Sequence, residues 1–108
     1  MMRWKYEPQW DILNVWMAEG KTSGSTRVPP DVIVDLADDG RVLALEILDV
    51  SEHIPFIRER PEGEVIARPE PLWPFRLQAS IGEERDGLVA YVRHIISVLN
   101  VLTSPVVV

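Results

Sequence analysis

Acidic side chains recur in the stretch DLADDGRVLALEILD, residues 35–49, at spacings that could bind a cation. With Asp35 at the first position of a calcium loop, Gly40 is the sixth residue and Glu46 the twelfth, as in an EF-hand. The third position is Ala37, whose side chain offers no oxygen ligand. An EF-hand also needs a helix on each side, whereas VIVDL and VLALEIL are typical of β-strands. We therefore predict no metal site here.

The same stretch is better interpreted as a β-hairpin with a two-residue type I′ turn at Asp39-Gly40. Three apolar pairs would then face one side: Val32 with Ile47, Val34 with Leu45, and Leu36 with Leu43. A slip of one residue would set apolar positions against polar ones and lose this common face. The pattern therefore fixes one register.

Asp35 and Glu46 are the functional candidates of this hairpin, because both would lie on its other face. Two neighbouring carboxylates could serve as acid and base, which gives the hypothesis of an acid/base enzyme. The simpler interpretation is structural: Glu46 either remains on a solvent-facing surface or, as we favour, forms a salt bridge to Lys5 or Arg27.

Other patterns that could carry chemistry lack the partners they need. Gly20-Lys21-Thr22 is similar to the end of a phosphate-binding loop, but Val15 stands where that loop requires glycine. His53 and His94 are the only histidines and have no metal-ligand spacing, and cysteine is absent. We predict no catalytic residue, no metal and no cofactor.

Length and composition predict one globular domain of 108 residues, with 46% hydrophobic and 26% charged residues. The net charge is −6, and residues 1–55 hold ten Asp/Glu against five Lys/Arg. A negative surface repels phosphate backbones, so we expect no nucleic-acid partner. The alternation Arg3-Trp4-Lys5-Tyr6 could form a stacking platform, but it is more typical of an amphipathic edge strand.

Neither a signal peptide nor a membrane span is predicted. No apolar run follows the charges of MMRWKY, and the apolar stretch 88–102 is interrupted by Arg93, His94, Ser97 and Asn100. With no cysteine, these features lead us to expect a soluble, cytoplasmic protein.

The elements that would position these residues form an α+β fold with an antiparallel sheet. Residues 1–54 are expected to form two hairpins and a short helix. In the first hairpin, Tyr6 faces Leu13 and Trp4 faces Val15. A polar loop is predicted over residues 19–26, and a capping box of Asp49 with Glu52 begins the helix, which Pro55 ends.

The second half is expected to complete the same domain. Residues 55–74 hold five prolines and are predicted to be a connection, with a short strand at 64–67. Residues 75–108 are predicted to form a strand at 75–79 and then a longer helix that begins at a capping box over 80–83. The apolar stripe of this helix runs to Leu102, with Arg93, Ser97 and Asn100 on its polar side.

The apolar face of the long helix is wider than one sheet face would cover, and Trp16 points away from the apolar side of its hairpin. Either the helix covers Trp16, or Trp16 is exposed for a partner. The width of the helix face indicates burial against two surfaces, either the sheet and the tail 105–108 or the sheet and another subunit. In the second case a possible interface between subunits is made of Trp16, Leu88, Val92, Ile95, Ile96 and Leu99.

Two segments, KYEPQWDILNVWM and PPDVIVDLADDGRVLALEILDVS, carry a family resemblance. With their Tyr-x-Pro turn, Asp-Gly hairpin and Glu-Ile-Leu-Asp strand end, residues 2–54 resemble the YuzE-like small proteins, a family of unknown function. The resemblance implies a small hairpin domain closed by a short helix, and no catalytic residue. Some members look like partners of small toxins.

Three functional hypotheses result. The first is a non-enzymatic interaction module that self-associates, as a homodimer. The second is an antitoxin-like inhibitor that binds a basic protein partner, because the first half of the chain is acidic. The third is the acid/base enzyme that uses Asp35 and Glu46.

Overall fold

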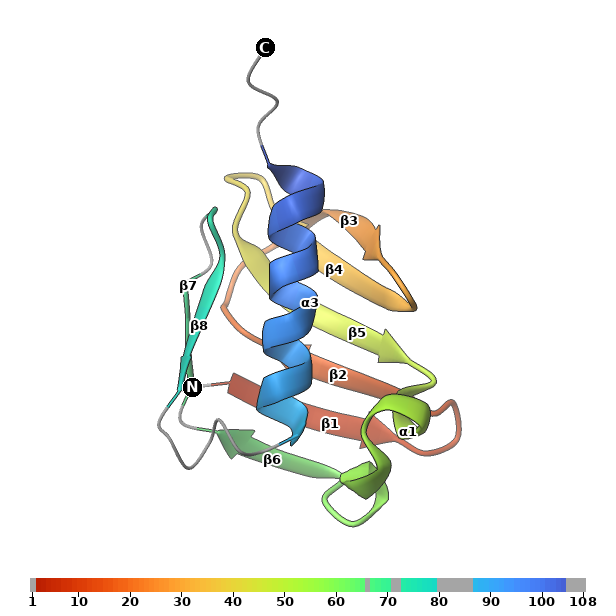
Figure 1. The fold of residues 1–108 in the computed structure, drawn as a ribbon. Coiled ribbons are helices and arrows are strands. Elements are labelled where there is room, and N and C mark those ends of the chain that lie inside the picture. Colours follow the sequence, from red (N-terminus) through yellow and green to blue (C-terminus); the bar gives the residue numbers. More distant parts are fainter. Residues whose placement is uncertain (1, 66, 71–72, 80–86, 105–108) are drawn as a thin grey trace.

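A computed structural model describes residues 2–65, 67–70, 73–79 and 87–104. The chain has an α+β fold in which helix α3 (Gly87–Thr103) crosses one face of a six-stranded antiparallel sheet (Figure 1). The strand order is β3-β4-β5-β2-β1-β6. The fold class predicted from the sequence is therefore confirmed.

The first hairpin joins β1 (Met2–Glu7) to β2 (Ile12–Trp16) in the predicted register. Trp4 lies opposite Val15 and Tyr6 opposite Leu13, and all four side chains are buried. The prediction that β1 is an edge strand is wrong, because β6 (Glu62–Val65) pairs with its other side. At Gly63 an added Cβ would lie 2.8 Å from the Trp4 ring, so glycine allows this close approach.

The second hairpin joins β4 (Val32–Ala37) to β5 (Val42–Leu48). Two of its three predicted pairs are confirmed: Val32 with Ile47, and Val34 with Leu45. The third is wrong, because Leu36 pairs with Val42 and the register shifts by one residue next to it. Leu43 is the extra residue on β5, and its carbonyl accepts hydrogen bonds from the amides of Met17 and Ala18.

The turn of this hairpin explains the shift. The Gly40 amide donates to the Ala37 carbonyl at 2.9 Å, and the Ala37 amide donates to the Arg41 carbonyl at 2.9 Å. Gly40 has a φ of 83°, whereas Asp38 and Asp39 are not among the residues with positive φ. The loop is therefore a type I turn closed by a left-handed glycine, not the predicted two-residue type I′ turn.

The polar segment predicted as a loop over residues 19–26 is mostly strand, so this prediction is wrong. Strand β3 (Thr22–Val28) pairs with β4 along its length and forms one edge of the sheet. Its side chains are largely exposed, and Val28 is its buried residue. An edge strand is held by its backbone ladder, so it can lack the apolar alternation that marks a half-buried strand.

The proline-rich segment 55–74 is more than the predicted connection. After α1 (Val50–His53) the chain forms a 3-10 helix, η1 (Pro55–Arg58), before it enters β6. It then forms β7 (Ala67–Glu70), which pairs with β8 (Arg76–Ala79) in a second, two-stranded sheet. The strand at 75–79 and the short helix after Asp49 are confirmed. The capping box at 80–83 lies outside the described residues.

Helix α3 packs its apolar side into the core between the two sheets. Six of its residues are buried: Leu88, Val89, Val92, Ile95, Ile96 and Leu99. Phe75 and Leu77, from the segment of β8, belong to the same cluster, so the wide apolar face has two partners within the chain. Leu102 is 57% exposed, which contradicts its predicted place in the apolar stripe.

The polar side of α3 is bonded to β8. The Asn100 side chain accepts a hydrogen bond from the Phe75 amide at 2.8 Å and donates one to the Phe75 carbonyl at 2.7 Å. The Arg93 guanidinium donates to the Leu77 carbonyl at 2.9 Å. Within the described part of the chain, no helix is long and apolar enough to cross a membrane.

Candidate interaction surface

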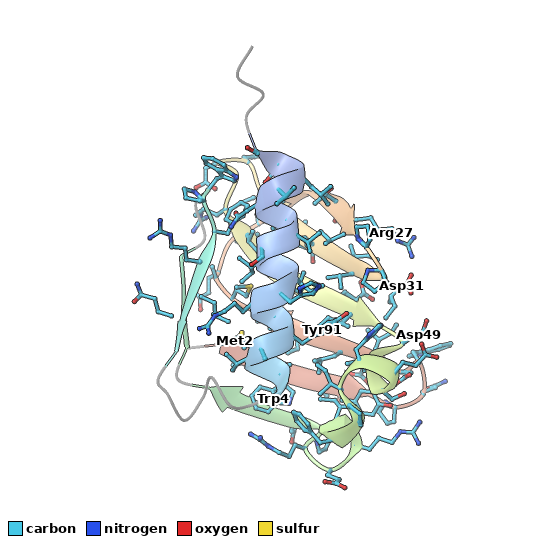
Figure 2. The ribbon with its side chains drawn as sticks, in the orientation of Figure 1. Met2, Trp4, Arg27, Asp31, Asp49 and Tyr91 are labelled. Carbon is cyan, nitrogen blue, oxygen red and sulfur yellow. The ribbon has the colours of Figure 1, made fainter. Side chains whose placement is uncertain are left out.

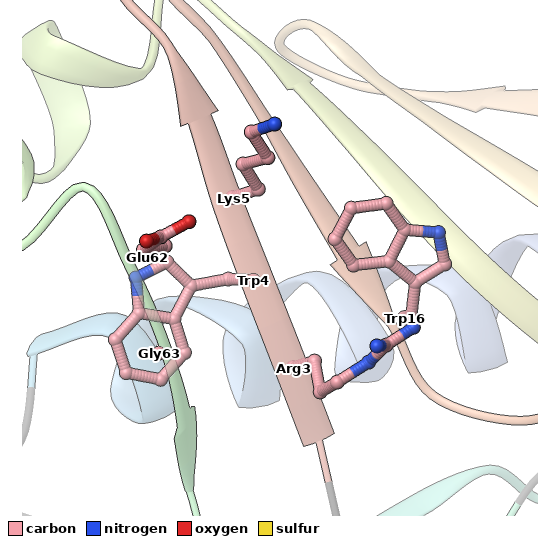
Figure 3. Close-up of a pocket in the computed structure, with 6 residues that line it drawn as sticks. All are labelled: Arg3, Trp4, Lys5, Trp16, Glu62 and Gly63. Carbon is pink, nitrogen blue, oxygen red and sulfur yellow. The ribbon is translucent and has the colours of Figure 1, made fainter.

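The sheet has a second face, opposite α3, which we call the outer face. Among the described residues no helix covers it, and in Figure 3 the strands lie in front of α3 with Arg3, Lys5 and Trp16 toward the viewer. Strand register places four residues side by side on the four inner strands, and we call them the central row: Asp35 on β4, Ala44 on β5, Trp16 on β2 and Arg3 on β1.

Two further rows of the outer face follow on the same side of the central row, and their residues are given in the order of the strands. The first contains Ile33, Glu46, Asn14 and Lys5. The second contains Leu48 and Ile12 on the two central strands. The acidic groups Asp35 and Glu46 thus lie on β4 and β5, and the basic groups Arg3 and Lys5 on β1. Ala44 and Trp16 separate the charges of the central row, and Asn14 separates Glu46 from Lys5.

Trp16 is the large aromatic side chain of this face. It is 38% exposed, and the Arg3 guanidinium carbon lies 5.3 Å from the centre of its ring, a cation–π contact. Beside it is a shallow pocket of about 410 Å³, shown in Figure 3 and lined by Arg3, Trp4, Lys5, Trp16, Glu62 and Gly63. Of the two alternatives left open for Trp16, the structure has it exposed and not covered by the helix.

The five helix residues of the predicted interface have a different position. Leu88, Val92, Ile95, Ile96 and Leu99 are at most 3% exposed, and they lie in the core that α3 forms with its own chain. An interface at these residues would require α3 to leave the sheet. Of the six residues in the predicted interface, Trp16 alone is exposed.

Asp35 and Glu46 do share the outer face, but they are not directly paired. Asp35 lies opposite Ala44, and Glu46 lies opposite Ile33, which makes the two carboxylates diagonal neighbours. Asp35 accepts a hydrogen bond from the Ser25 hydroxyl at 2.8 Å. Within the described residues, no three His, Cys, Asp or Glu side chains are arranged to hold a metal ion.

The predicted salt bridge of Glu46 is wrong. Lys5 Nζ lies 3.9 Å from Glu7 Oε1, and Arg27 Nη2 lies 3.4 Å from Asp31 Oδ1. Sheet order explains the difference, because β1 and β3 are each two strands away from β5. At about 4.8 Å per strand, both cations start about 10 Å from Glu46.

Asp11 organises a polar cluster that the sequence analysis missed. Its carboxylate accepts hydrogen bonds from the Tyr6 hydroxyl at 2.7 Å, the Ser51 hydroxyl at 2.7 Å and the Ser51 amide at 3.2 Å. Burial alone would raise the pKa of Asp11. The bonds from Ser51 and Tyr6, together with the nearby Arg58 charge, outweigh burial and hold this pKa below its ordinary value.

This cluster replaces the predicted capping box at the start of α1. Asp49 adopts a left-handed conformation, with φ 51° and ψ 40°, and its side chain makes no capping hydrogen bond. The carboxylate that caps the helix comes instead from Asp11, at the end of the first hairpin turn. A cap supplied by a residue 40 positions away leaves no local signal in the sequence.

His53 stacks on Tyr91, with ring centres 5.2 Å apart and ring planes 23° apart. Figure 2 shows Tyr91 on α3, directed toward the side of the molecule that carries Asp31 and Asp49. Burial, and to a lesser extent the negative charge of Asp31, raise the pKa of Tyr91. This contact joins α1 to α3. The other histidine, His94, is exposed on α3.

A second pocket of about 490 Å³ is lined by Tyr6, Pro8, Arg58 and Pro61. Neither Asp35 nor Glu46 lines this pocket or the one beside Trp16.

A comparison with known protein families matches part of the chain. Residues 3–51 match the family model described as Protein of unknown function (DUF2283). The match covers all the residues of the central row and ends within α1, so η1, β6–β8 and α3 lie outside it. No curated protein and no solved structure matches the chain significantly.

Proposed function

We propose that the protein is a non-enzymatic interaction module that self-associates through the outer face of its sheet. The observation that carries the proposal is Trp16, which is 38% exposed on a sheet face that no described helix covers. Tryptophan is enriched among residues that dominate binding energy, because it buries a large apolar surface with little loss of conformational freedom.

The surroundings of Trp16 suit an interface of modest strength. Ile12, Ile33, Ala44 and Leu48 are half-buried on the same face, and charged side chains surround them. A face of six strands about 4.8 Å apart, each about 20 Å long, measures on the order of 500 Å² in projection. Standard interfaces bury about 800 Å² on each partner. We therefore expect a dimer that dissociates in the micromolar range.

Sedimentation velocity over a range of micromolar concentrations tests the proposal. The expected result is a reversible shift from the 12.3 kDa monomer to a species of twice that mass. Trp16→Ser should weaken association at least about tenfold, because it removes the anchor of the interface.

Trp10→Ser is the matched control. Trp10 is more exposed than Trp16, at 66%, but it lies in the β1–β2 turn. Its replacement should leave association unchanged, with circular dichroism confirming that both variants stay folded. A chain that remains a monomer at all concentrations, or that loses association equally in both variants, would contradict the proposal.

An alternative is an antitoxin-like inhibitor that binds a basic protein partner. It is supported by the excess of acidic residues in the first half of the chain and by the resemblance of residues 2–54 to the YuzE-like proteins. Co-purification from the native host distinguishes the two. The inhibitor would retain one stoichiometric basic protein at low salt, whereas the self-associating module would be recovered alone.

The acid/base enzyme with Asp35 and Glu46 is the third alternative, and geometry supports it least. The two carboxylates are diagonal neighbours on an open face, and Asp35 is already bonded to Ser25. Asp35→Asn should therefore change association and leave any hydrolytic activity of the preparation unaltered.

A further inference from the structure

The outer face has an order of side chains that is complementary to itself. Along the central row the residues run from Asp35 through Ala44 and Trp16 to Arg3. Reversed, the row sets Asp35 against Arg3 and Trp16 against Ala44. An acidic group thus meets a basic group, and the largest side chain of the row meets the smallest.

The neighbouring rows are complementary in part, because Ile33 of one copy then meets Lys5 of the other. Reversing the row of Ile33, Glu46, Asn14 and Lys5 sets the Glu46 carboxylate against the Asn14 amide. This row continues at its two ends to Arg27 on β3 and Glu62 on β6, which also become opposed. In the remaining row, Leu48 meets Ile12.

We infer that the partner on the outer face is a second copy of this chain, related by a two-fold axis that runs parallel to the strands between β5 and β2. This inference rests on the proposed self-association. Such an axis reverses the order of the strands and keeps each row opposite itself, as in two sheets packed in an aligned arrangement. It places Trp16 of each copy over Ala44 of the other, and Arg3 against Asp35.

The other two-fold axis that could pack these faces together runs across the strands. It would set each strand over its own copy, with β1 facing β1 and β4 facing β4. With the axis through the central row, Arg3 would face Arg3 and Asp35 would face Asp35 of the second copy; with the axis between that row and the next, Arg3 would face Lys5. Like charges opposed across an interface are destabilising, so the axis along the strands is favoured.

The contact between Arg3 and Trp16 within one chain also favours this arrangement. Its guanidinium lies over the Trp16 ring, 5.3 Å from the ring centre, and both side chains are exposed. Less conformational freedom is lost when side chains that already contact each other are buried together. Asp35 is similarly oriented by its hydrogen bond from Ser25.

Charge reversal tests the arrangement, because each contact between Arg3 and Asp35 occurs twice in a two-fold dimer. Arg3→Asp alone and Asp35→Arg alone should each weaken the homodimer at least about tenfold, since each opposes two like-charged pairs. An equimolar mixture of the two variants should recover a dimer of near wild-type affinity, because both pairs in the heterodimer are then of opposite charge.

Arg76→Asp is the matched control, because it makes the same change in net charge at an exposed position on β8. It should leave the dimer unchanged and should not rescue Asp35→Arg in a mixture. Sedimentation with one variant carrying a fluorescent label reports the heterodimer directly.

The possible failures are distinguishable. A wild-type chain that stays monomeric overturns the proposed function and this inference together. A wild-type dimer that is weakened by Trp16→Ser but is insensitive to both charge reversals keeps the proposed function and overturns the arrangement. Loss of the dimer in both single variants without recovery in their mixture also overturns the arrangement.

Discussion

The two faces of the six-stranded sheet are built from the same strands but differ in composition and cover. The inner face is apolar on its central strands, where α3 covers it: Leu13, Val15, Val34, Leu45 and Ile47 are at most 1% exposed. The outer face alternates charged and apolar side chains that are half-buried or exposed. Apolar burial supplies most of the free energy of folding. The inner face therefore stabilises the fold, and the outer face is free to vary in chemistry.

The largest expected contrast between the faces is in stability. Ile47→Ala removes a fully buried side chain from the inner face of β5 and should lower the free energy of unfolding by about 2–5 kcal/mol. Ile33→Ala makes the same chemical change on the outer face of β4 and should cost about 1 kcal/mol or less. Urea denaturation of dilute, monomeric protein measures both. Equal losses would show that the outer face is part of the folding core.

A second prediction concerns the hydrogen bonds that join α3 to the segment of β8. Asn100→Ala removes both hydrogen bonds to the Phe75 backbone and should cost about 2 kcal/mol, because it leaves a partly buried amide and carbonyl unpaired. Ser97→Ala is the control, since its exposed hydroxyl bonds only within the helix. Thermal unfolding of the two variants gives the comparison, and similar melting temperatures would contradict this role of Asn100.

A third prediction concerns Asp11, which joins the first hairpin to α1 through hydrogen bonds from Ser51. The folded state lowers its pKa from 3.8, so its stabilising effect is complete above pH 3.8 and is lost as the pH falls through the folded-state value. Asp11→Asn keeps a residue that tolerates the φ of 52°. It should cost about 1 kcal/mol at pH 7, and the difference should shrink in acid. A difference that does not depend on pH would contradict the role of the charge.

The smallest expected effect on stability is at Gly40, in the turn between β4 and β5. Gly40→Ala places a side chain at φ 83° and should cost about 0.5–1 kcal/mol. Gly24→Ala, on strand β3 and with open space around the added Cβ, should cost less. Chemical denaturation resolves this difference if both variants are measured in parallel. A reversed order would show that the turn tolerates other conformations.

Periodicity in the sequence was sufficient to predict the elements that the core requires. The alternation of Trp4 and Tyr6 with Leu13 and Val15 gave the first register correctly, and the spacing of apolar residues gave α3. These signals exist because burial demands a repeating pattern. For the candidate surface, the outward direction of Trp16 was also predictable from alternation.

The parts that were missed depend on contacts between distant residues. Strand β3 is held by its backbone, so its Ser and Thr side chains gave no alternation. The cap of α1 comes from Asp11, and β6 reaches the sheet through a glycine that fits against Trp4. The partners of Glu46 were mispredicted because the strand order β3-β4-β5-β2-β1-β6 was not known. Without that order, rows across the outer face could not be drawn.

The claim that a second copy binds the outer face is tested most directly by NMR of the tryptophan indole N–H groups over a dilution series. We expect the Trp16 signal to shift with concentration, whereas Trp10, in the β1–β2 turn, and Trp4, buried and bonded to the Arg60 carbonyl, should keep constant signals. A Trp16 signal that is unchanged from millimolar to low micromolar protein, or a shift confined to Trp10, would contradict it.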